Sequence, residues 1–319
     1  MRQEIDHARQ GLFVGLAGID LVYLQDGLPS ENTKSRTNRY EAFIGGPAAN
    51  AAITYALLGG SAALVACIGE SEPGLLIKKA LAEDYGVQVL DPAVGQKTLP
   101  NISSVSISAA NASRTIWSGQ QAFAVDMGAA CGGEAMLSGL RGVEALDGAD
   151  ASMAAIHNTM ACATFCLFDS NAPEIAPALA RLAHNLGKPL VFDMGSWKPD
   201  TDLYLSLASE VIASSACIPP AGQGGFIEVA KRHGVPRFAI TQGEAPIYWC
   251  EDGWTGEVAP PQVQAMDTLG AGDVYHGAYC YFRFHAGLSF REALEAAAAV
   301  AAKSVEHFGP REGVRRYIR

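Results

Sequence analysis

Short runs dominated by apolar residues recur along this 319-residue chain. Because a strand points alternate side chains to opposite faces, a run that is apolar throughout must be covered on both faces. Helix-like stretches separate these runs, as a parallel sheet between two layers of helices requires. The sequence therefore predicts an α/β domain over residues 11–319, with a doubly wound, mostly parallel sheet. The runs are LFVGLAGI at 12–19, SAALVACIG at 61–69, TFCLFD at 164–169, PLVFD at 189–193, EVIAS at 210–214 and RFAIT at 237–241.

Two segments, residues 21–44 and 99–118, alternate polar and apolar positions instead. This pattern predicts hairpins, and turn-forming residues stand at 111–113. Each hairpin interrupts the strand–helix alternation of the main domain. We expect the two to form a small β-sheet that projects over a cleft as a lid. The alternative is a pair of ordinary surface hairpins.

The formal net charge of −10 argues against nucleic-acid or anionic-membrane partners, which require a basic patch. The seven cysteines show neither a C-x-x-C pair nor zinc-ligand spacing, which indicates a reduced compartment. Residues 1–10 are polar and are expected to be flexible, with no apolar core of signal-peptide type. The alanine-rich stretch at 292–308 carries charges and is too short to span a bilayer. These features predict a cytoplasmic protein.

A loop of small residues precedes an acidic helix start in DTLGAGD, at 267–273. Glycine loses more freedom on folding than any other residue, so Gly270 and Gly272 need a reason. At a helix N-terminus several backbone N–H groups lack partners and the helix dipole is positive. Bare N–H groups there bind phosphate-like anions, and absent side chains allow close approach.

Asp273 lies within the first turn of this predicted helix, beside the expected anion. A carboxylate there would repel a phosphoryl group unless it takes a proton from an attacking hydroxyl. The combination is typical of phosphoryl transfer, in which the enzyme positions the reactants and stabilises charge. The alternative interpretation is that Asp267 and Asp273 are acids favoured near a helix start, with a glycine turn between them.

The chain resembles the ribokinase-like (pfkB) family of carbohydrate and nucleoside kinases. DTLGAGD is similar to the family's C-terminal signature, and IGGPAANAA, at 44–52, is similar to its N-terminal signature. The resemblance extends to the element order and to both hairpin insertions. The likeness is closest to ketohexokinases and sulfofructose kinases, in DTLGAGD followed by a helix start that contains Asn or His.

The resemblance implies a role for each matching residue. It makes Asp273 the base that deprotonates the acceptor hydroxyl, and the Gly270, Ala271 and Gly272 backbone the anion hole. Asp20, which we expect to end the first strand, would bind sugar hydroxyls, as a carboxylate accepts two such hydrogen bonds. The other implied contacts are Gly45, Gly46, Asn50 and the lid residue Arg114 on the sugar, and Thr241, Gly243 and Thr268 on the nucleotide. Arg114 is equally compatible with a solvent-facing hairpin residue.

The sequence also departs from the family pattern. An N-x-x-E motif that helps to hold magnesium is replaced by SACIPPAG, at 215–222, so we assign no metal ligand. Pro246 replaces a glycine beside the nucleotide, and Pro47 follows the paired glycines. His276 and Asp193 have no family role here. His276 lies one turn after the base, and Asp193 ends a strand at the edge where ligands gather in open α/β sheets.

Two other enzyme classes lack their motifs. VGLAGID does not have the G-x-G-x-x-G spacing of dinucleotide-binding folds, and the P-loop motif G-x-x-x-x-G-K-[ST] is absent. The family resemblance implies a kinase that uses ATP and Mg²⁺ to phosphorylate a hydroxyl of a small carbohydrate, a ketohexose or a derivative, and this is our prediction. The alternatives are a nucleoside kinase of the same family and a non-catalytic sugar sensor. An apolar lid also suggests a homodimer.

Overall fold

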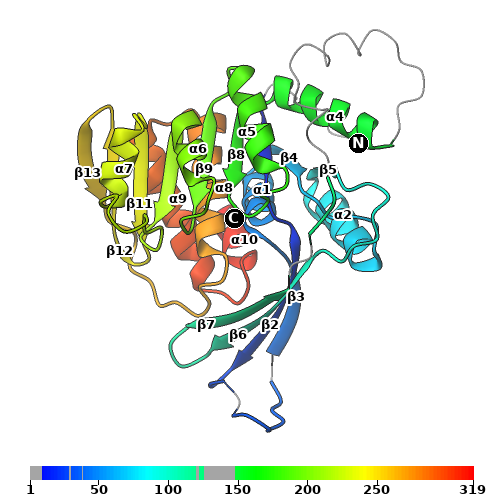
Figure 1. The fold of residues 1–319 in the computed structure, drawn as a ribbon. Coiled ribbons are helices and arrows are strands. Elements are labelled where there is room, and N and C mark those ends of the chain that lie inside the picture. Colours follow the sequence, from blue (N-terminus) through cyan, green and yellow to red (C-terminus); the bar gives the residue numbers. More distant parts are fainter. Residues whose placement is uncertain (1–8, 29, 38, 120–121, 126–147) are drawn as a thin grey trace.

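The computed structural model describes residues 9–28, 30–37, 39–119, 122–125 and 148–319. Figure 1 shows a large sheet with helices on both faces, from which a smaller sheet projects. This arrangement confirms the predicted doubly wound α/β fold. Residues 1–8, for which we predict flexibility, lie outside the described residues, and the first strand begins at Gln10.

The large sheet has nine strands in the order β13-β12-β11-β10-β9-β8-β1-β4-β5. All neighbours are parallel except the pairs β11–β12 and β12–β13. The apolar runs become its central strands because both of their faces are buried. The strands are β1 (Gln10–Val14), β4 (Ser61–Val65), β5 (Gln88–Leu90), β8 (Phe165–Asp169), β9 (Leu190–Met194), β10 (Glu210–Ser214), β11 (Arg237–Gln242), β12 (Ala245–Glu251) and β13 (Trp254–Val258).

Two hydrophobic cores lie on opposite faces of this sheet. In β1, Leu12 and Val14 point into one core and Phe13 into the other. The first core is covered by α4 (Gly148–Cys162), α5 (Ala176–Asn185), α6 (Thr201–Leu207) and α7 (Phe226–Arg232). The second is covered by α1 (Pro47–Leu57), α2 (Glu72–Tyr85), α8 (Ala271–Cys280), α9 (Phe290–Val305) and α10 (Glu312–Tyr317). None of the described helices is both long and apolar enough to cross a membrane.

The smaller sheet, which we call the lid sheet, combines both predicted hairpins. Its strands are β2 (Gly18–Gln25), β3 (Arg39–Gly45), β6 (Asn101–Ser108) and β7 (Arg114–Gly119), in the order β3-β2-β6-β7. The two hairpins join through a parallel pairing of β2 with β6. Figure 1 shows this sheet standing away from the body.

The segment LFVGLAGI is not one strand, and this expectation was wrong. β1 ends at Val14, and β2 starts at Gly18 in the other sheet. The Leu16 N–H donates to the buried Asp169 Oδ2 at 2.9 Å, which takes the chain out of the large sheet. Asp20 therefore lies within β2 of the lid sheet and does not end the first strand.

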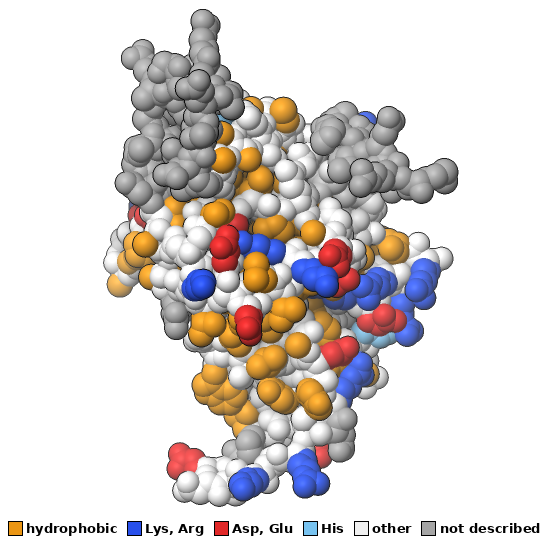
Figure 2. Space-filling view, turned by 90° about the vertical axis from the view of Figure 1, so that its right-hand side faces the viewer, with side chains coloured by type: hydrophobic (Ala, Val, Ile, Leu, Met, Phe, Trp, Pro, Cys, Tyr) orange, Lys and Arg blue, Asp and Glu red, His pale blue; other side chains and the backbone are white. Residues whose placement is uncertain are grey.

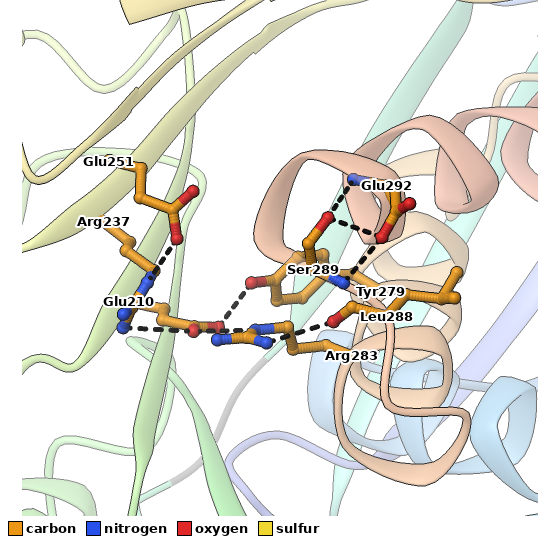
Figure 3. A network of polar contacts seen from close by, with 8 residues as sticks. All are labelled: Glu210, Arg237, Glu251, Tyr279, Arg283, Leu288, Ser289 and Glu292. Atoms are coloured by element: carbon orange, nitrogen blue, oxygen red, sulfur yellow. Dashed lines mark hydrogen bonds and ion pairs between the residues drawn. The ribbon is translucent and has the colours of Figure 1, made fainter. Parts of the chain in front are cut away.

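A polar network anchors α8 at the opposite end of the sheet from the strand carboxyl ends (Figure 3). Glu210, at the start of β10, is 2% exposed. It accepts hydrogen bonds from the Tyr279 hydroxyl and, at 3.0 Å, from Arg283 Nε. Arg283 belongs to a π-helical turn, η2 (Tyr281–His285), that continues α8. The network therefore ties the C-terminal end of α8 to the sheet.

Candidate active site

A cavity of about 710 Å³ opens at the carboxyl ends of the central strands. The strand order reverses at β1, which pairs with β4 on one side and β8 on the other. In open α/β sheets ligands bind outside the strand carboxyl ends, and this cavity is lined there by Asp193 of β9, Ser214 of β10 and Thr241 of β11. The N-terminus of α8 faces this cavity with Gly270, Ala271, Gly272 and Asp273.

The start of α8 has the geometry that DTLGAGD predicts. Gly270 is the N-cap, with φ of 68°, a left-handed conformation that favours glycine. A side chain at Gly272 would meet no protein atom within 4 Å, so the glycine keeps open space rather than relieving a contact. Asp273 follows in the first helical turn. The Ala271 N–H donates to the Thr268 carbonyl oxygen at 3.4 Å, whereas the open space beside Gly272, at the positive end of the helix, fits an anion.

Asp273 is held from the other side by Asn50 of α1. Asn50 Nδ2 donates to Asp273 Oδ2 at 2.6 Å, across 223 residues of sequence. The two helices approach closely because Gly277 lacks a side chain: a Cβ there would stand 2.3 Å from the Ala51 carbonyl oxygen. The glycine in α8 thus brings the two predicted signatures into contact.

Asp20 and the paired glycines lie on this same side of Asp273. The Asp20 carboxylate fills the space beside Gly45, where a Cβ would stand 2.3 Å from Oδ2. Gly46 has φ of 94°, and a Cβ there would lie 2.3 Å from the Leu16 carbonyl oxygen. Burial, and next the charge of Asp273, raise the pKa of Asp20 to about 6. The two carboxylates are therefore electrostatic neighbours.

The residues that we predict to face the nucleotide, Thr241 and Gly243, line the cavity itself. Thr241 lies in β11, and Gly243, with φ of 64°, lies in the turn that follows. The pairing of β11 with β12 shifts register between Ile240 and Gln242, one turn before Pro246. The opposite wall is mostly small and apolar and comprises Pro260, Pro261, Val263, Ala298, Ala301, Ala302 and Val305.

Arg114 and Thr268 connect the lid sheet to the α8 loop. Arg114 NH1 donates to the Thr268 carbonyl oxygen at 3.1 Å and to its hydroxyl at 2.9 Å. The Thr268 hydroxyl also donates to the Ala112 carbonyl oxygen at 3.2 Å. Both residues line the cavity, so the lid tip lies against the predicted anion site.

His276 and Asp193 also line the cavity. His276 Nδ1 lies 2.7 Å from the Gly272 carbonyl oxygen, and Nε2 lies 3.2 Å from that of Ile212. Carbonyl oxygens only accept hydrogen bonds, so both form together only when both ring nitrogens carry a proton. Asp193 Oδ2 is 3.4 Å from Nδ1, and burial raises the pKa of Asp193 to about 6.

Two charged residues of the site carry no pattern in the sequence. Asp169 is buried and accepts hydrogen bonds from the N–H groups of Leu16 and Ala48, both at 2.9 Å. Arg311, just before α10, is 3% exposed and donates to Asn50 Oδ1 at 2.5 Å. Sequence reasoning missed both residues. Only the strand-end position of Asp169 could have indicated it.

The cavity provides few carboxylates for a metal ion. Its lining holds Asp193, Glu244 and Asp273, and residues 215–222 after β10 contain no acid. Within the part of the chain that the structure describes, no three His, Cys, Asp or Glu side chains form a metal cluster. This lining fits Mg²⁺, which keeps several waters and binds through one or two carboxylates and substrate phosphates.

Solved structures of ribokinases share this fold. The Thermotoga maritima ribokinase is 18% identical, with a TM-score of 0.70 and coverage of 98% of both chains. The Giardia lamblia ribokinase is 15% identical, with a TM-score of 0.76 and coverage of 97% of this chain and 98% of that chain. The Arabidopsis thaliana ribokinase, solved with ribose and ATP, is 20% identical, with a TM-score of 0.67 and coverage of 98% and 99%.

The family model of pfkB carbohydrate kinases matches residues 9–122 and 225–316. These two segments include the lid strands and the whole α8 region, and together they make up more than half of the chain. The chain therefore belongs to the pfkB family of carbohydrate kinases and has the fold of the ribokinases.

Proposed function

We propose that this enzyme transfers the γ-phosphoryl group of ATP to a hydroxyl of a small sugar, a ketohexose or a derivative. The observation that carries the proposal is the position of Asp273. It lines the large cavity, and it also accepts a hydrogen bond from Asn50 beside Asp20 and Gly45. A carboxylate shared by two subsites can take a proton from an acceptor in one while the phosphate donor occupies the other.

The acceptor subsite consists of Asp20, Gly45, Gly46 and Asn50. Carboxylate and amide oxygens accept hydrogen bonds from sugar hydroxyls, and the bare glycines let the ring approach the backbone. Asp273 then removes the proton of the attacking hydroxyl. The N–H groups of the α8 first turn, at Gly270 to Gly272, stabilise the charge on the migrating phosphoryl group. Arg114 closes the lid tip over this loop and excludes water.

The donor subsite consists of Thr241, Gly243 and Thr268 with the apolar wall of the cavity. A cavity of about 710 Å³ is in the range of nucleotide-sized ligands. Mg²⁺, when bound with ATP, neutralises phosphate charge. We propose that Asp193 would hold the water shell of that ion, since it lines the same cavity as Gly272 and Asp273. The Arabidopsis ribokinase, which shares this fold, is solved with both ribose and ATP, which supports a sugar and ATP as the two ligands.

The ketohexose assignment rests on the stretch from Asp267 to His276, which is similar to ketohexokinases and sulfofructose kinases. A panel of sugars, sulfonated ketoses and nucleosides, assayed for ADP release with Mg-ATP, tests it. We expect fast turnover on a ketose or sulfonated ketose. Fast turnover on nucleosides alone would show a nucleoside kinase. Sugar binding without turnover on any panel member would show a sensor.

Asp273→Asn tests the base. The variant should bind the acceptor as the wild type does in calorimetry, while kcat falls by roughly 10²–10⁴-fold, the range for loss of a general base. Asp252→Asn is the matched control, because Asp252 is exposed in the turn between β12 and β13 and lies outside the cavity lining. Near-normal kcat in Asp273→Asn would show that another group removes the proton.

We also propose that the lid sheet pairs with a second copy of this chain. Every residue of the edge strand β7 is exposed, and the large apolar side chains Tyr40, Ile116 and Trp117 are 73%, 45% and 59% exposed. Figure 2 shows hydrophobic side chains over the part of the lid sheet next to the body and charged side chains at the end farthest from the body. Exposed edge strands are templates for pairing. Light scattering should give twice the mass of one chain for the wild type. The Trp117→Lys variant should have the mass of a single chain.

A further inference from the structure

Arg311 lies beneath the acceptor subsite with no role in the reaction described above. It is the N-cap residue of the six-residue helix α10 and is 3% exposed. A cation at a helix N-terminus faces the positive end of the dipole, and burial removes it from water. Neither effect favours an arginine, so its position calls for partners of opposite charge.

The guanidinium of Arg311 has two hydrogen-bonded partners and one ring neighbour. Its NH2 group donates to Asn50 Oδ1 at 2.5 Å and to the Ile44 carbonyl oxygen at 2.7 Å. Nε and NH1 are buried without a hydrogen-bond partner of normal geometry among the described residues. The Tyr85 ring centroid lies 5.7 Å from Cζ, in the range of a cation–π contact.

The contact with Asn50 decides which way that amide points. Arg311 only donates, so the Asn50 atom that faces it must be the oxygen. The amide nitrogen is then turned toward Asp273 Oδ2, 2.6 Å away. Asp273 and Arg311 therefore select the same orientation of the amide, and without Arg311 only the contact with Asp273 holds it.

Arg311 also supplies the positive charge of a subsite that holds two carboxylates. The groups that act on Asp20 are Asp273 of α8, the Ser103 hydroxyl of β6 and Arg311. Burial and Asp273 raise the pKa of Asp20, whereas Ser103 and Arg311 lower it. Burial lowers the pKa of Arg311, and Tyr85, Asp273 and Asp20 oppose that effect.

We propose that Arg311 is a positioning residue of the acceptor subsite. It holds the Asn50 amide through Oδ1, and it places its charge at the Ile44 carbonyl oxygen, next to Gly45, against which the Asp20 carboxylate lies. Its effect on turnover rests on the proposed function, in which Asp273 is the base. Its effect on Asp20 does not, because that effect exists in the protein without substrate.

The decisive experiment follows the Asp20 carboxyl carbon by NMR across pH, in protein labelled at aspartate, with Asp20→Asn to assign the signal. We expect a titration midpoint near 6 in the wild type. In Arg311→Met the midpoint should rise, because Arg311 lowers the pKa of Asp20. Arg311→Lys should return it close to the wild-type value. An unchanged midpoint in folded Arg311→Met overturns the proposal.

Two further variants serve as an alternative to Arg311→Met and as its control. If Arg311→Met does not fold, Arg311→Gln keeps a donor to Asn50 and Ile44 without the charge, and the same midpoint decides the outcome. Arg315→Met is the matched control: it belongs to the same helix, is exposed and also lies near the Tyr85 ring, 6.0 Å from its centroid. Its midpoint should equal that of the wild type.

Turnover with D-fructose and Mg-ATP tests the orienting role. Arg311→Met should lower kcat/KM by roughly tenfold to a hundredfold, the range for loss of a hydrogen bond to a charged group. If Arg311 acts through Asn50, adding Arg311→Met to the Asn50→Ala variant should cause little further loss, whereas multiplied losses would refute the relay. If the wild type phosphorylates no sugar, the proposed function fails while the Asp20 titration still decides the role of Arg311.

Discussion

The Gly272→Ala variant distinguishes the effect of this glycine on stability from its effect on binding of the phosphoryl group. A methyl group at this position meets no protein atom within 4 Å, and the residue lies in the first turn of α8. The free energy of unfolding should therefore stay equal or rise by up to about 1 kcal/mol, because alanine restricts the unfolded chain. The same methyl group occupies the space that we assign to the migrating phosphoryl group.

The expected loss in kcat is about 10²–10³-fold, as when one anion-hole donor is removed, equivalent to roughly 3–4 kcal/mol of transition-state stabilisation. Urea unfolding measures the stability, and coupled ADP release measures the turnover. Gly225→Ala is the control, because a Cβ there also meets nothing and Gly225 lies outside the cavity lining. Wild-type turnover in a stable Gly272→Ala variant would refute the anion hole.

Three further predictions address the surrounding structure. Gly277→Ala should lower the free energy of unfolding by about 1–3 kcal/mol in urea, because its Cβ meets the Ala51 carbonyl oxygen at 2.3 Å; equal stability would mean that α1 and α8 separate freely. The pKa of Asp20 is about 6 in the folded protein, against an ordinary value of 3.8 for the unfolded chain, so this group contributes stability below about pH 4 that is lost as pH rises through 6. Asp20→Asn should therefore raise the thermal midpoint at about pH 7.5 but not at about pH 4, and the opposite order would contradict the shift. Glu210→Gln should lower the free energy of unfolding, because it removes the negative charge that faces Arg283 at 3.0 Å. We expect the low end of roughly 3–5 kcal/mol, since Arg283 is partly exposed to water. An unchanged urea midpoint would show that the network does not stabilise the fold.

The parts of the fold that local patterns control could be predicted from the sequence. Runs that are apolar throughout predict the central strands of the large sheet. The small residues before Asp273 predict a helix start there, and α8 begins at Ala271. The signature asparagine, Asn50, does contact Asp273. These features follow from the chemistry of neighbouring residues, which a sequence displays directly.

The rest depends on contacts between distant residues. Arg311 reaches Asn50 across 261 positions, and nothing in the local FGPREG stretch distinguishes it from a surface arginine. The break between β1 and β2 depends on Asp169, which binds the Leu16 N–H across 153 positions. The apolar run LFVGLAGI predicts a single strand as long as its contact with Asp169 is not known.

The short break at residues 15–17 places the acceptor contacts on two separate bodies. Asp20 is carried by the lid sheet, whereas Asn50 and Asp273 are carried by helices of the body. A rotation of the lid sheet about residues 15–17 and 45–46 would carry Asp20 away from the other two. If such a rotation accompanies sugar binding, ATP bound alone would meet a site that lacks Asp20. Release of the phosphorylated sugar requires the reverse rotation, and a slow rotation would make turnover decrease with solvent viscosity.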